Sequence, residues 1–137
     1  MKKLRLVLGV LLVFAIVLSA CQKAAEPTPV AEEGEAAHRV AMVLPGLKTD
    51  EAFNQYTYEG MVRAAQEFGF ETAYVEEVSQ DEQVEVIRQF AQQGYDIIIG
   101  QGGQFGESLM TVAKEFPDLN FVFSVATDTG GVPNLTA

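Results

Sequence analysis

Strand-like and helix-like segments alternate along most of the chain, and this alternation limits the possible folds more than any other feature of the sequence. The strand-like segments are rich in β-branched and aromatic residues. They are residues 38–44 (HRVAMVL), 71–78 (ETAYVEEV), 95–100 (YDIIIG) and 120–126 (NFVFSVA). They recur at a spacing of roughly 25 residues, which is typical of right-handed βαβ units. The sequence therefore predicts an α/β fold with a doubly wound parallel sheet.

Three segments between these strands carry apolar residues at helical spacing. The first helix is expected over residues 50–68, with an inner face of Phe53, Tyr56, Gly60, Met61, Ala64, Ala65 and Phe68. The second is opened by a capping-box sequence at residues 79–82 and ended near Gly94, with an inner face of Val84, Ile87, Phe90 and Ala91. The third uses Phe105, Leu109, Val112, Ala113 and Phe116 and stops before Pro117.

The amino-terminal residues 1–20 have the pattern of a secretory signal peptide. Three cations precede an apolar run over residues 6–18, and small residues follow. The run is short for a bilayer span, which needs about 20 residues. Cys21, the only cysteine, comes directly after Leu-Ser-Ala, and this tetrapeptide resembles the bacterial lipobox. We expect Cys21 to be lipidated on the extracytoplasmic face of a bacterial cell membrane, although an ordinary signal peptide followed by a chance cysteine is the alternative.

Residues 21–37 contain prolines, small residues and carboxylates, which predicts a flexible tether ahead of a domain over residues 38–137. Removing residues 1–20 would leave six basic against nineteen acidic groups, a net charge of −13. Such a charge repels phosphate backbones, so nucleic acid is not an expected partner. With His38 as the only histidine, a catalytic triad, a metal site or a cofactor is not expected either.

Ligands of open parallel sheets bind beyond the carboxyl ends of the strands. The first segment in this position, residues 45–54, contains a Phe53-Asn54 pair. The ring of Phe53 could stack on a planar ligand and Asn54 could form hydrogen bonds with it. Alternatively, Phe53 begins the core-facing stripe of the helix. Asp50 could contact a ligand or cap the helix.

Two further segments reach the same edge of the sheet. Residues 100–108 (GQGGQFGES) are rich in glycine, and the candidate ligand contacts there are Gln101, Gln104 and Phe105. This loop lacks the G-x-G-x-x-G spacing and the P-loop lysine, so phosphate binding is disfavoured. In the last segment, residues 126–131, Asp128 is either a ligand-facing carboxylate or a turn-forming residue.

Several of these segments together resemble the basic membrane protein family, which comprises substrate-binding lipoproteins of ABC transporters and includes purine-nucleoside receptors. The matching segments are VAMVLPG, DEAFNQYTYEG, QGYDIIIG, VAKEFPDLNFVF and VPNL. The resemblance implies a lobe of the periplasmic-binding-protein type I class, with a second lobe missing from this amino-terminal part. It also implies that Phe53 stacks on a base or similar ring, that Asn54 hydrogen-bonds it, and that a permease and an ATPase are the partners.

The sequence departs from the family pattern at two positions. Nucleoside-binding members carry an aspartate at the end of the first strand, where this chain has Leu44, and the loop after the third strand has Glu107 near the position of a family aspartate. Loss of the first carboxylate removes an acceptor for ribose hydroxyls. The expected ligand is therefore a small polar or nucleoside-like molecule.

The expected function is binding without catalysis, for an ABC importer. Two alternatives remain at this point. One is a nucleotide-dependent α/β enzyme that uses residues 100–106, and the other is a lipoprotein that senses a ligand for signalling.

Overall fold

The structure is a computed structural model, and it describes residues 38–137. The expected signal peptide (1–20), the expected lipidation site Cys21 and the expected tether (21–37) lie outside the described residues. No helix within residues 38–137 combines the length and the apolar character that a membrane span requires.

A five-stranded sheet forms the centre of the described domain. The strands are β1 (Arg39–Val43), β2 (Glu71–Val75), β3 (Ile97–Gln101), β4 (Asn120–Ser124) and β5 (Leu135–Thr136). Their order is β2-β1-β3-β4-β5, and every neighbouring pair is parallel. The predicted parallel α/β sheet is therefore confirmed, and the predicted strands all lie in it.

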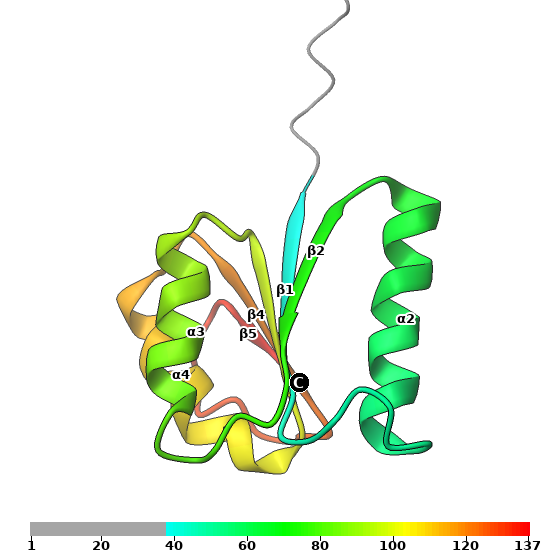
Figure 1. The fold of residues 1–137 in the computed structure, drawn as a ribbon. Helices are drawn as coiled ribbons and strands as arrows, with labels where there is room; N and C mark the ends of the chain where they lie inside the picture. Colours follow the sequence, from blue (N-terminus) through cyan, green and yellow to red (C-terminus); the bar gives the residue numbers. More distant parts are fainter. Residues whose placement is uncertain (1–37) are drawn as a thin grey trace, which may run out of the picture. The chain divides into compact units, whose positions relative to one another are not determined.

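Helices cover both faces of this sheet (Figure 1). They are α2 (Phe53–Phe68), α3 (Gln83–Gln92) and α4 (Gly106–Glu115), with a short 3-10 turn, η1 (Gly103–Phe105), ahead of α4. In Figure 1, α2 lies on one side of the sheet, and α3 and α4 lie on the other. This is the doubly wound arrangement, which places the loops after β1, β3 and β4 at one edge.

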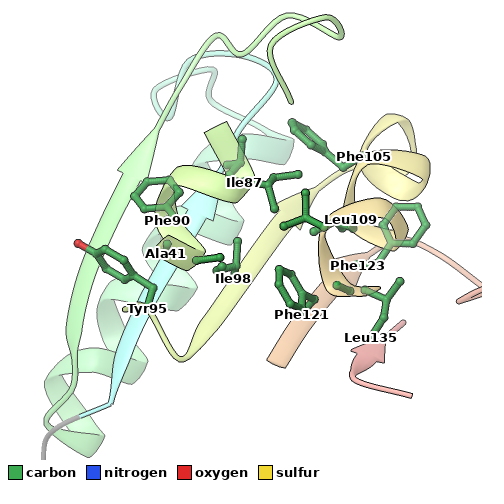
Figure 2. Close-up of a cluster of buried hydrophobic side chains, with 14 of the residues drawn as sticks. Ala41, Ile87, Phe90, Tyr95, Ile98, Phe105, Leu109, Phe121, Phe123 and Leu135 are labelled. Atoms are coloured by element: carbon green, nitrogen blue, oxygen red, sulfur yellow. The ribbon is translucent and has the colours of Figure 1, made fainter. Parts of the chain in front are cut away.

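The main core lies between the sheet and the helices α3 and α4. Figure 2 shows how side chains from the strands β1, β3 and β4 meet those of the two helices there. Fully buried members include Ile87, Ile98, Leu109 and Phe121. The inner faces predicted for the second and third helices are thus confirmed, because Ile87, Phe90, Ala91, Leu109, Val112 and Ala113 are all buried.

The inner face predicted for α2 is correct for Met61, which is buried, but wrong for its three aromatic residues. Phe53, Tyr56 and Phe68 are 44%, 67% and 73% exposed, whereas Asn54, which was not predicted to face inward, is buried. Met61 packs in a second, smaller cluster with the β1 residues Val40 and Met42 and with Leu44. The helix is turned so that Asn54, rather than the aromatic rings, is buried together with Met61, and Asn54 Nδ2 donates to Asp50. This rotation leaves three aromatic rings on the outer side of α2.

Two local boundaries differ from the sequence expectation. The strand β4 ends at Ser124 because Val125 has a φ of 62°, a left-handed conformation that ends an extended strand. The capping box is formed on one side only. The backbone N–H and the hydroxyl of Ser79 both donate to the carboxylate of Glu82. The regular helix α3 begins directly after Glu82, at Gln83.

Candidate ligand-binding site

The loop between β1 and α2, residues 44–52, is held against the end of strand β2. The backbone N–H of Lys48 donates to a carboxylate oxygen of Glu76 at 2.9 Å, and the ammonium group of Lys48 donates to the hydroxyl of Tyr74. The hydrogen bond to Tyr74 and the nearby charge of Glu76 raise the pKa of Lys48, against the smaller opposing effect of desolvation. This loop therefore has a defined position at the ligand-binding edge.

Asp50 caps the amino-terminal turn of α2. Its carboxylate accepts hydrogen bonds from the backbone N–H groups of Ala52 (3.0 Å), Asn54 (3.1 Å) and Gln55 (3.1 Å). Desolvation acts to raise the pKa of Asp50, but these bonds together with one from the Asn54 side chain outweigh it and hold the pKa below its ordinary value of 3.8. The capping role that the sequence left open for Asp50 is thus present in the structure.

The cap makes a pH-dependent contribution to stability. Because folding lowers the pKa of Asp50, its stabilisation is fully present above the ordinary value of 3.8 and is lost as the pH falls through the lowered pKa. We therefore expect Asp50→Ala to lower the Tm at pH 7, and the difference from the parent chain to shrink as the pH is lowered below 3.8. Thermal unfolding followed by circular dichroism from pH 7 to strongly acidic pH measures this, with the non-titrating neighbour Thr49→Ala as control. A Tm difference that stays constant over this range would contradict the assignment.

Asn54 is buried directly beside this cap, with 7% of its surface exposed. Its Nδ2 donates to Asp50 Oδ2 at 2.9 Å and lies close to Gly46, where an added Cβ would be only 2.9 Å away. Asp50 therefore fixes the orientation of the Asn54 amide. Asn54 Oδ1 has no hydrogen-bond partner in the described part of the chain, and a buried acceptor without a partner costs about 1–3 kcal/mol.

Phe53 presents its ring outside the core while its backbone is fixed. The residue is 44% exposed, and its backbone carbonyl accepts hydrogen bonds from Gln101 Nε2 and Thr57 Oγ1, both at 3.1 Å. The exposed ring and the buried amide oxygen of Asn54 thus occupy consecutive positions at the carboxyl edge of the sheet.

Gln101 connects three elements beneath this position. It is 1% exposed; its Nε2 donates to Thr57 Oγ1 at 2.6 Å on α2, and its Oε1 accepts from Ser124 Oγ at 2.6 Å on β4. Ser124 Oγ in turn accepts from the backbone N–H of Gly102 at 3.0 Å. All of these bonds are to protein groups, so Gln101 acts in this structure as a link between helix and sheet.

The remaining candidates differ in their exposure. Phe105 is fully buried in the main core. Gln104 is exposed and folds over Gly102, which has a φ of 106° and where an added Cβ would lie 2.6 Å from Gln104 Oε1. Asp128 is exposed and accepts the backbone N–H of Gly130 at 2.8 Å, so it has the turn-forming role that the sequence offered as one alternative.

The sequence analysis missed Thr57 and Ser124 as members of this arrangement. Thr57 lies one helical turn after Phe53, and Ser124 is the parallel-sheet partner of Gln101. The spacing of Phe53 and Thr57 was available in the sequence, but the register of β3 with β4 was not. Leu44, where the resemblance to nucleoside-binding members implies an aspartate, is fully buried in the smaller cluster. Within residues 38–137, no cluster of three or more His, Cys, Asp or Glu side chains is placed to hold a metal ion.

The fold and the position of this edge define a lobe of the periplasmic-binding-protein class. An ABC transporter solute-binding protein from Conexibacter woesei is 31% identical, with a TM-score of 0.65 over 72% of this chain and 34% of that one. A solute-binding protein from Aeropyrum pernix is 25% identical, with a TM-score of 0.66 over 72% of this chain and 27% of that one. A lipoprotein fragment from Peptoclostridium difficile is also 25% identical, with a TM-score of 0.65 over 72% of this chain and 82% of that one.

The family follows from the sequence itself. The family model described as "ABC transporter substrate-binding protein PnrA-like" (Bmp) matches residues 37–136. The chain therefore belongs to this family of substrate-binding proteins, as the resemblance of its motifs predicted.

Two curated relatives are much longer than this chain. An uncharacterized lipoprotein from Pyrococcus furiosus is 31% identical over 101 residues, which cover 73% of this chain and 25% of the relative. The transcriptional activator protein Med from Bacillus subtilis is 26% identical over 89 residues, which cover 64% of this chain and 28% of the relative. The chain thus spans little more than a quarter of the length of either curated relative.

Proposed function

We propose that residues 38–137 form one wall of the ligand-binding cleft of an ABC importer's substrate-binding protein, and that Phe53 and Asn54 contact the ligand. The observation that carries this proposal is the unpartnered oxygen of Asn54, buried next to the exposed ring of Phe53. A ligand that donated a hydrogen bond to Asn54 Oδ1 would recover the cost of leaving that acceptor unsatisfied. Because this atom is covered, binding would include a small shift of the loop over residues 44–52.

The other residues of the site have distinct roles in this proposal. Gln104 and Asp128 are exposed at the same edge and are available to a ligand. Asp50 orients the amide of Asn54, Gln101 fixes the backbone of Phe53, and Phe105 supports the loop from the core. The ligand contacts are thus held by a buried layer, as precise binding sites require.

The chemistry of the site favours a neutral, planar ligand with hydrogen-bond donors. The ring of Phe53 offers a stacking surface, and Asn54 offers an acceptor. The apolar Leu44 at the end of β1 offers no carboxylate for ribose hydroxyls. A nucleobase or a nucleoside-like molecule held mainly through its ring agrees with these features.

Replacing Phe53 tests this site. We expect Phe53→Ala to weaken binding about tenfold, because stacking of a base on an aromatic ring contributes about 1–3 kcal/mol. The measurement is native mass spectrometry and calorimetry of the full chain with a panel of nucleobases, nucleosides and neutral sugars. Phe68→Ala is the matched control, since this ring is also exposed on α2 but lies at the opposite end of the helix. Equal binding by the two variants would exclude Phe53 from the site.

The membrane anchor is a separate part of the proposal. Cys21 would carry the lipid and hold the protein at the extracytoplasmic face, where a permease and its ATPase would receive the ligand. Intact-mass spectrometry of the chain extracted from bacterial membranes tests this. We expect a mass that begins at Cys21 and includes acyl chains, and a Cys21→Ser variant that lacks them. An unmodified Cys21 would rule out the anchor.

A sensing role is the second candidate function, because one curated relative bears the name of a transcriptional activator. The net charge of −13 after residue 20 disfavours direct contact with DNA, so such a role would act through the bound ligand. Co-purification of the full chain with an ABC permease would favour transport over sensing.

The enzyme alternative receives no support from the loop after β3, because an added Cβ at Gly100 would lie 2.7 Å from Leu109 and 2.9 Å from Phe105. That glycine serves core packing.

A further inference from the structure

A pocket lies between the first turns of α3 and α4, on the face of the sheet opposite α2. Its volume is about 460 Å³, and its lining includes Gln80, Gln104, Glu107, Ser108 and Thr111. Pockets that hold small molecules usually have volumes of about 300–1,000 Å³. Helix α2 lies on the opposite face of the sheet (Figure 1), so this pocket shares only Gln104, in the loop after β3, with the site described above.

The two hydroxyl groups of the pocket have already used their hydrogens. Ser108 Oγ donates to Gln83 Oε1 at 3.1 Å, within a pair of buried side chains. Thr111 Oγ1 donates to the backbone carbonyl of Glu107 at 2.8 Å. A hydroxyl carries one hydrogen and two acceptor lone pairs. Toward the pocket, both side chains therefore present acceptors.

The charge of the pocket also favours a ligand that donates hydrogen bonds. Glu107 contributes a carboxylate, and the lining contains no lysine, arginine or histidine. Glu107 lies in the first turn of α4, where its charge also offsets the positive end of the helix dipole. The side-chain amides of Gln80 and Gln104 can each supply an additional acceptor. A guest with its own donors and a positive charge is complementary to the Glu107 carboxylate and to the two hydroxyl oxygens.

We propose that this pocket binds a small cationic amine, with an ammonium group that contacts Glu107 and donates to Ser108 Oγ and Thr111 Oγ1. An ammonium group has three donors and no acceptor, which matches a lining of acceptors. This inference does not depend on the function proposed for Phe53 and Asn54.

The full chain titrated with putrescine tests the proposal. We expect putrescine to bind in calorimetry, whereas its uncharged analogue 1,4-butanediol and the dianion succinate do not. Binding should weaken as salt is raised, because the contact with Glu107 is partly exposed. Glu107→Gln should weaken putrescine binding about tenfold, a typical effect of losing a charge-assisted hydrogen bond. Asp118→Asn removes the same charge from an exposed position outside the pocket and should leave binding unchanged.

Nuclear magnetic resonance locates the binding independently of any variant. Putrescine is expected to shift the backbone amide signals of Gly103, Gln104, Glu107 and Ser108, and to leave those of Phe53 and Asn54 in place. Absence of putrescine binding, equal binding of 1,4-butanediol, or equal loss in Glu107→Gln and Asp118→Asn would overturn the proposal. Shifts confined to Phe53 and Asn54 would also overturn it and would assign the amine to the first site.

Discussion

Phe105→Ala is expected to lower the free energy of unfolding by about 3–5 kcal/mol, the usual cost of removing a fully buried phenylalanine ring. Phe105 is completely buried in the main core. It packs so closely on Gly100 that a Cβ added to this glycine would lie 2.9 Å from the Cβ of Phe105. Truncation would leave a cavity under the loop after β3 that the tightly packed neighbours cannot fill. Urea unfolding monitored by circular dichroism measures the loss.

Phe68→Ala provides the matched control for this variant. It removes the same ring from a position that is 73% exposed at the end of α2. Exposed substitutions usually change stability by less than about 0.5 kcal/mol. Similar losses in the two variants would show that the ring of Phe105 is not a core residue in solution, and would reopen direct ligand contact for it.

Gln101→Leu is expected to cost about 2–4 kcal/mol, because it buries an apolar side chain in a hydrogen-bond network and removes one partner from each of the other members. The hydroxyls of Thr57 and Ser124 and the carbonyl of Phe53 all bond to the Gln101 amide. Leucine matches the size of the side chain but restores none of these bonds. Denaturant unfolding measures the stability, and hydrogen exchange of the amides in the first turn of α2 reports whether that turn has loosened.

The neighbouring glutamine supplies the control. Gln104→Leu makes the same substitution three residues later at an exposed position, and its expected effect on stability is below about 0.5 kcal/mol. If Gln101→Leu were as stable as Gln104→Leu, or if exchange in the first turn of α2 were unchanged, Gln101 could not be the link that positions Phe53.

The sequence predicted the order and type of the elements because each kind of element repeats with its own period. The buried strand β3, with three consecutive isoleucines, and the stripe of Leu109, Val112 and Ala113 on α4 gave unambiguous patterns. The helix α2 failed this test, since two neighbouring rows of its side chains both contain apolar residues. Packing against the sheet buries Met61 from the predicted row together with Asn54 from the neighbouring row, and no local pattern encodes that choice.

The sequence could place the candidate residues together at the carboxyl edge of the sheet, but it could not tell which of them would be buried. Strand ends identify the edge, because parallel strands terminate together. Whether a side chain there faces solvent depends on how neighbouring strands and helices pack. Gln101 and Gln104 have similar sequence surroundings, yet one is buried between α2 and β4 and the other is exposed.

The strand order has a consequence for how the domain assembles. β1 is the first strand in the chain but lies between β2 and β3 in the sheet. Arg39 at its start contacts Glu71, 32 residues later, and Asp96, 57 residues later. Such distant pairings carry a loop-closure cost and slow folding. During synthesis, β1 therefore cannot pair with both of its neighbours until the chain has emerged as far as Gln101, the end of β3.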